Sequence, residues 1–424
     1  MKRIISAILA AALCVLSLTA CSNDEEFSDS EKLLKKYSRS DDATKTYNYS
    51  DGATDPPNAY NNYAAAVTEF SLKELSEISK DSGESFVFSP ASSALQLVML
   101  ANAASPDIRQ DILLGFGGTL GIDDLNPCSS YCMSRMEAVS KSGDKTDACV
   151  KLGGALLVDN SLDVKTAFLQ NIKDFFGYDV LRYKFSGENA SKKLKNYLKS
   201  YTSNSGISPD GDTADLVGAT KISDAWLDGY YSDAETDVFK GSDGEEEMDF
   251  YSSNEIKIHT DKAQGVIKYT AKNPLKLVLV MPDEGTSIDD YLKSFNSQEY
   301  NDLLSSVDVT KRTTAVIPEF SVKSRSEAYE LSEPLSNCGF SSVFSGKAGL
   351  SALSFKEGAC FGEMYEVRPD FVFDKDGINS GKLKPENDGE ELQKTDDSVI
   401  FDRPFIFMLI DNESNIPVQM GIYR

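Results

Sequence analysis

The sequence has 424 residues, with 67 acidic and 43 basic side chains and a formal net charge of -24 at pH 7. A field of this sign repels nucleic-acid phosphates and anionic lipid heads, which argues against nucleic-acid binding and against a membrane contact based on charge. A single histidine, together with the lack of a nucleophile elbow, a P-loop and a dinucleotide fingerprint, argues against an enzyme, and we expect no cofactor.

The N-terminus has the pattern of an export signal. Met1-Lys2-Arg3 is followed by an uncharged run from residue 4 to residue 19, which is too short for a comfortable membrane span. The run ends in Leu18-Thr19-Ala20-Cys21, which resembles the lipobox of bacterial lipoproteins and implies a diacylglyceryl group on Cys21. We therefore expect residues 1–20 to be a signal peptide, and the protein to be an exported lipoprotein on a bacterial surface, attached to the membrane only through its lipid. Ordinary secretion with an unmodified Cys21 is the alternative.

The remaining chain divides into two parts. Residues 21–57 are polar, acidic and poor in large aliphatic side chains, so they cannot bury enough surface to fold alone and are expected to be a flexible tether. Residues 58–424 contain no linker rich in Pro, Gly or Ser and no internal repeat, which predicts one large domain.

Cysteines and possible metal ligands predict no chemistry. Five cysteines follow Cys21, and an odd number in an exported chain means at least one free thiol: Cys128, Cys132, Cys149, Cys338 and Cys360. Cys128 and Cys132 are interpreted either as a disulfide or as two separate buried thiols. Asp374 and Asp376 suggest a calcium loop, but Gly377 comes too early for one, so no metal is expected.

Helical patterns come early in the domain and strand patterns come late. Apolar residues recur at helical spacing from Tyr63 to Ile78, and Ser89-Pro90 opens a second helix that is apolar nearly all round and therefore buried. Further helices are expected at 168–176 and 192–201, and strands at 255–259, 275–281, 313–320 and 405–410. The class is therefore α+β with mostly antiparallel sheets. His259 is interpreted as a strand-face residue and not as a catalytic base.

Four groups of residues, spread in order along residues 58–424, form recognisable motifs. They are Phe88-Ser89-Pro90-Ala91-Ser92; Ala225-Trp226 with Tyr230, Thr236, Phe239 and Asp243-Gly244; Pro318, Phe320, Leu331, Leu335, Gly339, Phe340 and Phe344; and Phe401-Asp402-Arg403-Pro404-Phe405-Ile406-Phe407 with Met420-Gly421. Read in order, these motifs resemble landmarks of the serpin family over almost all of residues 58–424. The most specific is the ending, which is similar to the family's F-x-R-P-F-x-F followed by F-M-G.

The resemblance implies a serpin-like fold with a large mixed central sheet, further β-sheets, roughly eight or nine helices and an exposed reactive loop. Serpins offer this loop to a protease, and after cleavage the loop inserts into the central sheet and drags the attached protease along. The expected function is a non-enzymatic, monomeric inhibitor of serine proteases, with cysteine proteases as an alternative target. A non-inhibitory binding protein with the same fold is the second hypothesis.

The hinge of the loop departs from the family pattern. The family's E-E-G-T falls on Lys375-Asp376-Gly377-Ile378, with Asn379 and Ser380 next, and only Gly377 matches. Alternate residues turn inward in an inserted strand, so Ile378, Ser380, Lys382 and Lys384 would be buried. Burying unpaired ammonium groups costs several kcal/mol, and Pro385 removes a ladder donor, so insertion should be slow or should halt.

Family loop length places the scissile bond about fourteen residues after Gly377, at Glu391-Leu392, and leaves Gln393 and Lys394 as alternatives. A cleaved Glu would favour a glutamate-preferring protease, and Lys394 would favour a trypsin-like one.

The resemblance also assigns residues to the region where the central sheet opens. Ser89, Ser92 and Trp226 match the family there. The family's Asn aligns with Gly218 and its His with Val367, so the hydrogen-bond network that joins those two residues is expected to be absent. These departures support a non-inhibitory role about as well as inhibition.

Overall fold

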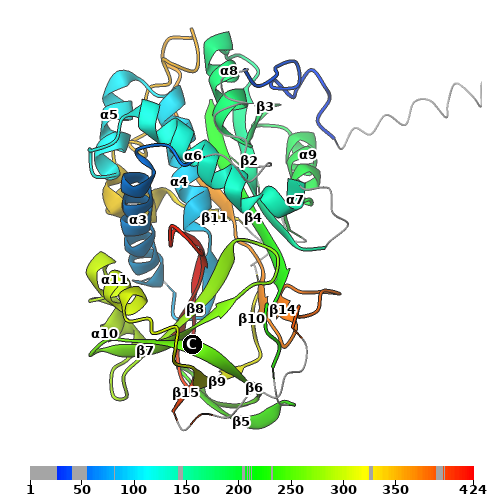
Figure 1. Ribbon diagram of the computed structural model, residues 1–424. Helices are drawn as coiled ribbons and strands as arrows, with labels where there is room; N and C mark the ends of the chain where they lie inside the picture. Colours follow the sequence, from blue (N-terminus) through cyan, green and yellow to red (C-terminus); the bar gives the residue numbers. More distant parts are fainter. Residues whose placement is uncertain are drawn as a thin grey trace, which may run out of the picture.

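Two β-sheets form the body of the protein, with most helices gathered at one end (Figure 1). The structure is a computed structural model that describes residues 26–40, 55–80, 82–141, 147–202, 206–207, 209, 211, 213–230, 233–323, 328–387, 395 and 397–424. Strands β5 to β9 and β15 lie at the end opposite the main helical group (Figure 1). No helix among these residues is long and apolar enough to cross a membrane.

The two helices expected first along the domain are present. The amphipathic helix α3 spans Tyr60–Lys80, and α4 spans Pro90–Ala103 with every residue buried. Ser89 begins α4, since its hydroxyl accepts from the backbone N–H of Ser92 at 3.3 Å and Pro90 fits the first turn. The described residues hold eight further α-helical segments: α5 (Pro106–Gly115), α6 (Ile122–Met136), α7 (Ala138–Lys141), α8 (Thr166–Phe175), α9 (Glu188–Leu198), α10 (Ile288–Leu292), α11 (Ser297–Ser305) and α12 (Ser332–Leu335).

The central sheet is built around β4 (Ala214–Ala225). On one side β4 pairs with β2 (Cys149–Asp159), which in turn pairs with β3 (Asp179–Tyr183). On the other side β4 pairs in parallel with β12 (Met364–Val367), which carries β11 (Tyr329–Glu330). Beyond Ala219 and Val367 the two strands part, and β14 (Gly377–Ile378) lies between β4 and β13 (Phe371–Phe373), with β10 (Phe320–Val322) outside. We call the point where β4 and β12 part the sheet opening.

The second sheet is longer and mostly antiparallel. Its central strand, β16 (Phe405–Asp411), is buried along its whole length because it pairs with a strand on each side and has apolar clusters on both faces. The α+β class predicted from the sequence is confirmed, with a mixed central sheet. In order, the strands are β1 (Phe86–Phe88), β17 (Pro417–Tyr423), β16, β8 (Leu275–Pro282), β7 (Ala263–Tyr269), β6 (Gly244–His259), β9 (Thr313–Pro318) and β15 (Ser398–Ile400), with β5 (Glu235–Gly241) beside β6.

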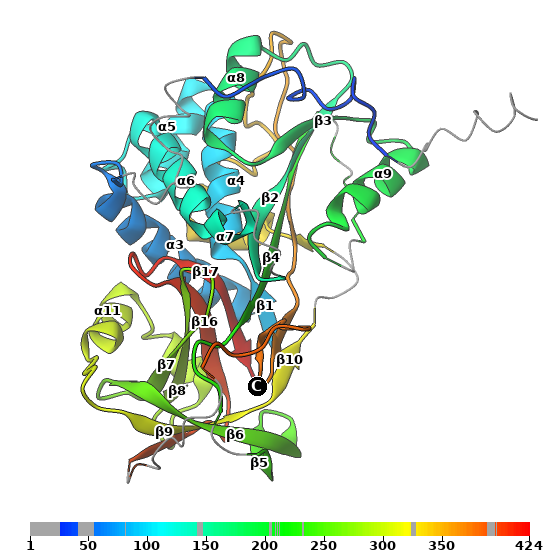
Figure 2. The same ribbon diagram turned by 45° about the vertical axis from the view of Figure 1, so that its right-hand side comes forward.

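Part of the segment expected to be a flexible tether packs on the domain. Residues 26–40 run from beside α9 along β3 toward α8 (Figure 2). Phe27 is 5% exposed and packs edge-on against Tyr197, and Leu34 is 3% exposed. The Leu33 N–H donates to Val180 O, so the segment adds backbone hydrogen bonds to the edge strand β3. The tether prediction is therefore wrong for residues 26–40, because two apolar side chains and an open strand edge let this segment bind to the domain.

Candidate functional site: the loop hinge and the sheet opening

The first residues of the expected reactive loop are already part of the central sheet. Gly377 pairs with Ala225, and Ile378 pairs with both Asp224 and Phe373. Both loop residues are buried, which corrects the expectation of a loop exposed from its hinge onward. A Cβ at Gly377 would lie 2.0 Å from the backbone O of Asp224, so only glycine fits between the strands here.

Asn379 ends this short insertion. Its φ of 46° turns the chain out of the sheet, in a backbone region that Asn tolerates better than most residues. Its side-chain Nδ2 donates to Ile222 O at 2.8 Å and to Asp370 O at 2.9 Å, so it bridges β4 and the chain leading into β13. Its Oδ1 accepts from the Val372 N–H at 3.0 Å, and its own N–H donates to Val372 O.

Asp374 holds the turn before β14. Its Oδ1 accepts the backbone N–H groups of Asp376 and Gly377, and both of its carboxylate oxygens lie within 3.1 Å of the Ser380 hydroxyl. Its backbone O accepts the indole N–H of Trp226 at 2.9 Å. Trp226, fully buried and the only tryptophan in the sequence, packs against Phe373 with ring centroids 5.2 Å apart. The hinge, the loop turn and the buried indole are therefore one connected unit.

The two lysines expected to resist insertion lie outside the sheet. Lys382 and Lys384 are exposed, and the Lys384 Nζ pairs with Asp376 Oδ2 at 2.5 Å. Lys375 is exposed as well. The chain then runs back along the body, where Asn387 Nδ2 donates to Asp228 Oδ1 and the Asn387 N–H donates to Leu227 O.

The sheet opening is lined by buried polar side chains. In the register of β4 and β12, Gly218 lies opposite Glu366, and Val367 lies opposite Ala219. The Ser89 N–H donates to Glu366 Oε1 at 2.5 Å, and the Ser89 hydroxyl donates to Val418 O. Burial raises the pKa of Glu366 to about 7, although the Ser89 N–H and Arg368 oppose the rise.

Gln96 takes the space that a side chain at position 218 would occupy. A Cβ on Gly218 would lie 2.3 Å from Gln96 Nε2 and 2.4 Å from the Ser92 Oγ. Neither polar atom of Gln96, nor Oε2 of Glu366, has a hydrogen-bond partner among the described residues. Burial also raises the pKa of Glu74 well above its usual value, with the Glu366 charge adding to the effect. Some buried polar atoms in this region therefore have no hydrogen-bond partner among the described residues of the closed sheet.

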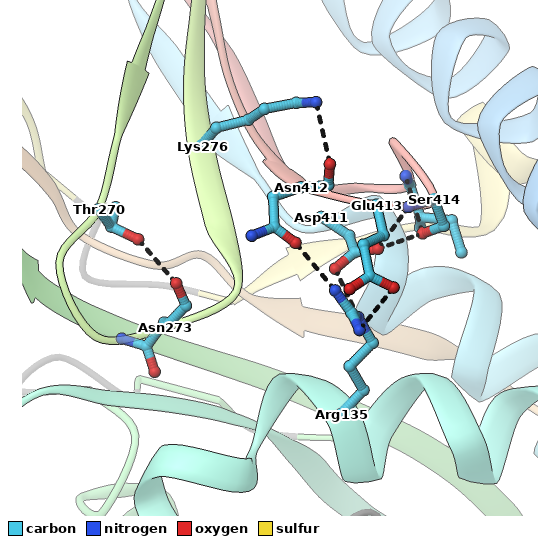
Figure 3. Close-up of polar contacts among 9 residues, drawn as sticks. Arg135, Thr270, Asn273, Lys276, Asp411, Asn412, Glu413 and Ser414 are labelled. Carbon is cyan, nitrogen blue, oxygen red and sulfur yellow. Dashed lines mark hydrogen bonds and ion pairs between the residues drawn. The ribbon is translucent and has the colours of Figure 1, made fainter. Parts of the chain in front are cut away.

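A second cluster of buried polar side chains, away from the loop, is held by ion pairs and hydrogen bonds. Arg135 on α6 donates to Asp411 Oδ1 at 2.9 Å and to Asn412 Oδ1 at 2.8 Å, and it pairs with Glu413 (Figure 3). Asp411 Oδ2 accepts from both the N–H and the hydroxyl of Ser414. This cluster ties α6 to the turn between β16 and β17.

Other sequence-based expectations have these outcomes. Cys21 and Glu391, Leu392, Gln393 and Lys394 lie outside the described residues. The five described cysteines are free thiols, and burial raises the pKa of Cys132 to about 12. His259 is exposed at the end of β6. Among the described residues, no group of three or more His, Cys, Asp and Glu side chains could hold a metal ion.

Sequence reasoning missed the role of Asn379 and the position of Glu366. The sequence does offer a signal for the turn at Asn379, because Gly381 follows it by two residues and both residue types favour left-handed backbone. In the structure Gly381 has a φ of 60°. Nothing in the sequence could place Glu366 opposite Gly218, because that depends on the register between two strands far apart in the chain.

Comparisons with known proteins agree with this architecture. The chain is similar to tengpin, a thermophilic serpin solved in its native state, with a TM-score of 0.77, 22% identity, and coverage of 94% of this chain and 99% of that one. It is also similar to human thyroxine-binding globulin, with a TM-score of 0.70 and 17% identity over 86% of this chain and 98% of that one. Among curated relatives, Iripin-3 of Ixodes ricinus is 21% identical over 84% of this chain and 93% of its own length.

A closed sheet with a loop at its opening defines the class of protein, and a family model confirms it. The model for Serpin (serine protease inhibitor) matches residues 65–424. The chain belongs to the serpin family, and the family predicted from the sequence is confirmed. Membership supports protease inhibition in general.

Proposed function

We propose that this protein is a serpin-type inhibitor of serine proteases that acts by loop insertion, and that a lipid on Cys21 displays it on the surface of a bacterium. The observation that carries the proposal is the closed sheet. β4 and β12 pair directly over Leu216 to Ala219, and among the loop residues that the structure describes only Gly377 and Ile378 lie in the central sheet. Room for further insertion therefore exists along the boundary between β4 and β12, if those strands separate.

The bait segment in this proposal is the stretch between Asn387 and Thr395, which includes Glu391 and Lys394. Both ends of the stretch are held, by Asp228 at Asn387 and by Thr314 at Thr395. The test is incubation with a panel of glutamate-preferring and trypsin-like serine proteases, and with cysteine proteases. A complex that survives SDS is expected with at least one serine protease. Loop cleavage alone across the whole panel would contradict inhibition.

Surface display needs its own test. Cys21→Ser should move the protein from the membrane fraction to the soluble exported fraction, because a lipid and not the acidic chain provides the attachment. Cys338→Ser is the matched control, since that thiol is buried in the domain. Retention of Cys21→Ser in the membrane would contradict lipid anchoring.

A non-inhibitory serpin is the second candidate, and the hinge favours it. Lys382 and Lys384 would enter the sheet during insertion, where an unpaired ammonium is costly. If they alone prevent trapping, the double variant Lys382→Ala/Lys384→Ala should form SDS-stable complexes that the wild type does not form. Lys347→Ala, at another exposed lysine, is the control. A variant that is cleaved without forming complexes would favour a role independent of insertion.

A further inference from the structure

We infer that Asn379 is a stop that holds the loop at the two-residue stage of insertion and thereby sets the rate of the inhibitory step. The inference rests on the proposed function and names the positioning residue that regulates it. We call residues 379–383 the hinge turn; its first residue has left-handed backbone and its last donates the Leu383 N–H back to Ser380 O.

The first argument is hydrogen bonding. The Asn379 side chain satisfies Ile222 O on one side and Asp370 O and the Val372 N–H on the other. These are backbone groups that a further residue of inserted strand would otherwise pair with. The Asn379 side-chain amide thus takes the place of the next backbone hydrogen bonds of the sheet. The flanking strands therefore form no additional hydrogen bonds when the next loop residue inserts.

The second argument is backbone conformation. Entering the sheet requires φ near -120° or below, whereas Asn379 has φ 46° and Gly381 has φ 60°. Both residues must therefore rotate before the next pair can form. Asn is one of the few residue types that occupy the left-handed region at little cost, so the present conformation is stable where a β-branched residue would favour the strand.

The third argument is the link between the hinge turn and the residues around it. The Ser380 hydroxyl donates to Asp374, and the Lys384–Asp376 pair closes the turn from outside. Moving Asn379 breaks these contacts together, because Ser380 and Lys384 must travel with it. Asp374 also accepts the Trp226 indole N–H, so the single tryptophan reports the release.

The experiment compares insertion rates after cleavage in the segment 388–394, followed by Trp226 emission and by the melting temperature at successive times. Asn379→Thr should insert roughly tenfold faster than wild type or more, since it loses three side-chain hydrogen bonds and prefers extended backbone. Asn379→Gly, which keeps the left-handed backbone and loses only the side chain, should be intermediate. Asn301→Ala, at an exposed asparagine of α11 outside the loop, is the control and should insert at the wild-type rate.

Each variant is also measured in a Lys382→Ala/Lys384→Ala background. There the cost of burying the two lysines cannot mask a change in the insertion rate. If Asn379→Thr inserts no faster than wild type in both backgrounds, including the case in which neither inserts, the stop is overturned. Failure of the proposed function looks different: the wild type forms no SDS-stable complex, although Asn379→Thr still inserts faster. Equal rates with good complex formation would reject the stop and keep the inhibitor.

Discussion

Asp411, at the end of strand β16, and Glu366, at the sheet opening, are both fully buried, but they differ in how completely their carboxyl oxygens are hydrogen-bonded. β16 pairs with a strand on each side. The carboxylate of Asp411, at its end, forms an ion pair with Arg135 and accepts a hydrogen bond from the Ser414 hydroxyl. At the sheet opening, Gln96 and one oxygen of Glu366 have no hydrogen-bond partner among the described residues, and the same holds for the side chain of Gln419 on β17. A buried polar group without a partner costs about 1–3 kcal/mol. The Glu366 carboxyl group therefore stabilises the closed sheet less than the Asp411 carboxylate stabilises the end of β16.

The largest effect is expected at the satisfied region. Arg135→Ala leaves Asp411 buried without its cation and should cost about 3–5 kcal/mol in free energy of unfolding. Chemical denaturation measures the loss. Lys293→Ala, which breaks an exposed ion pair with Asp290, is the control and should have little effect on the free energy of unfolding. A loss of similar size for both variants would contradict the importance of the buried Arg135–Asp411 pair.

The next effect concerns Glu366 at the sheet opening and depends on pH. Its folded pKa is about 7, raised from 4.5, so its contribution to stability is fully present below pH 4.5 and is lost as pH rises through about 7. Glu366→Gln mimics the protonated form and keeps an acceptor for Ser89. At pH 8 it should be more stable than wild type by up to about 3 kcal/mol, and at pH 4 nearly equal to it.

The comparison between wild type and Glu366→Gln removes the contribution of titrating groups that do not interact with Glu366, whereas Glu74, Arg368 and Tyr178 interact with its charge and contribute to the difference. Denaturation at a series of pH values measures it. A stability difference that does not change between pH 4 and pH 8 would contradict the assigned burial of the carboxyl group.

A smaller effect is expected for the N-terminal segment. Phe27→Ala should release residues 26–40 from β3 and cost about 1–2 kcal/mol, less than a core deletion because the segment can detach without leaving a cavity in the domain. Hydrogen exchange should speed up at the amides of Leu33 and Arg182 and stay unchanged in β16. Ser30→Ala, on the exposed side of the same segment, is the control; faster exchange there too would mean that Phe27 does not hold the segment.

The smallest effect is expected at the exposed pair of the hinge. Lys384→Ala removes the contact with Asp376 and should change the free energy of unfolding by less than about 1 kcal/mol, because the lysine is solvent-exposed. The change should shrink further in high salt. A loss above 2 kcal/mol in denaturation would mean that the hinge contributes to global stability and is not a locally held element.

Much of the fold could be predicted from the sequence because its signals are local. The apolar helix after Ser89-Pro90 and the strand from Phe405 follow from periodicity and capping. The hinge could be located from Gly377, but the hydrogen bond that holds Asn379 to Ile222 could not be predicted, because Ile222 is far away in the sequence. The same reason explains why the position of Glu366 opposite Gly218 and the docking of residues 26–40 near Tyr197 were missed.

The central claim is that the uncut sheet is incomplete and can gain a strand. The measurement that tests it most directly is the melting temperature of the protein before cleavage in the segment 388–394 and after cleavage with prolonged incubation. We predict a rise of about 10 °C or more, which for a chain of this size corresponds to several kcal/mol of added stability. An unchanged or lower melting temperature, in the wild type and in Lys382→Ala/Lys384→Ala alike, would contradict the claim.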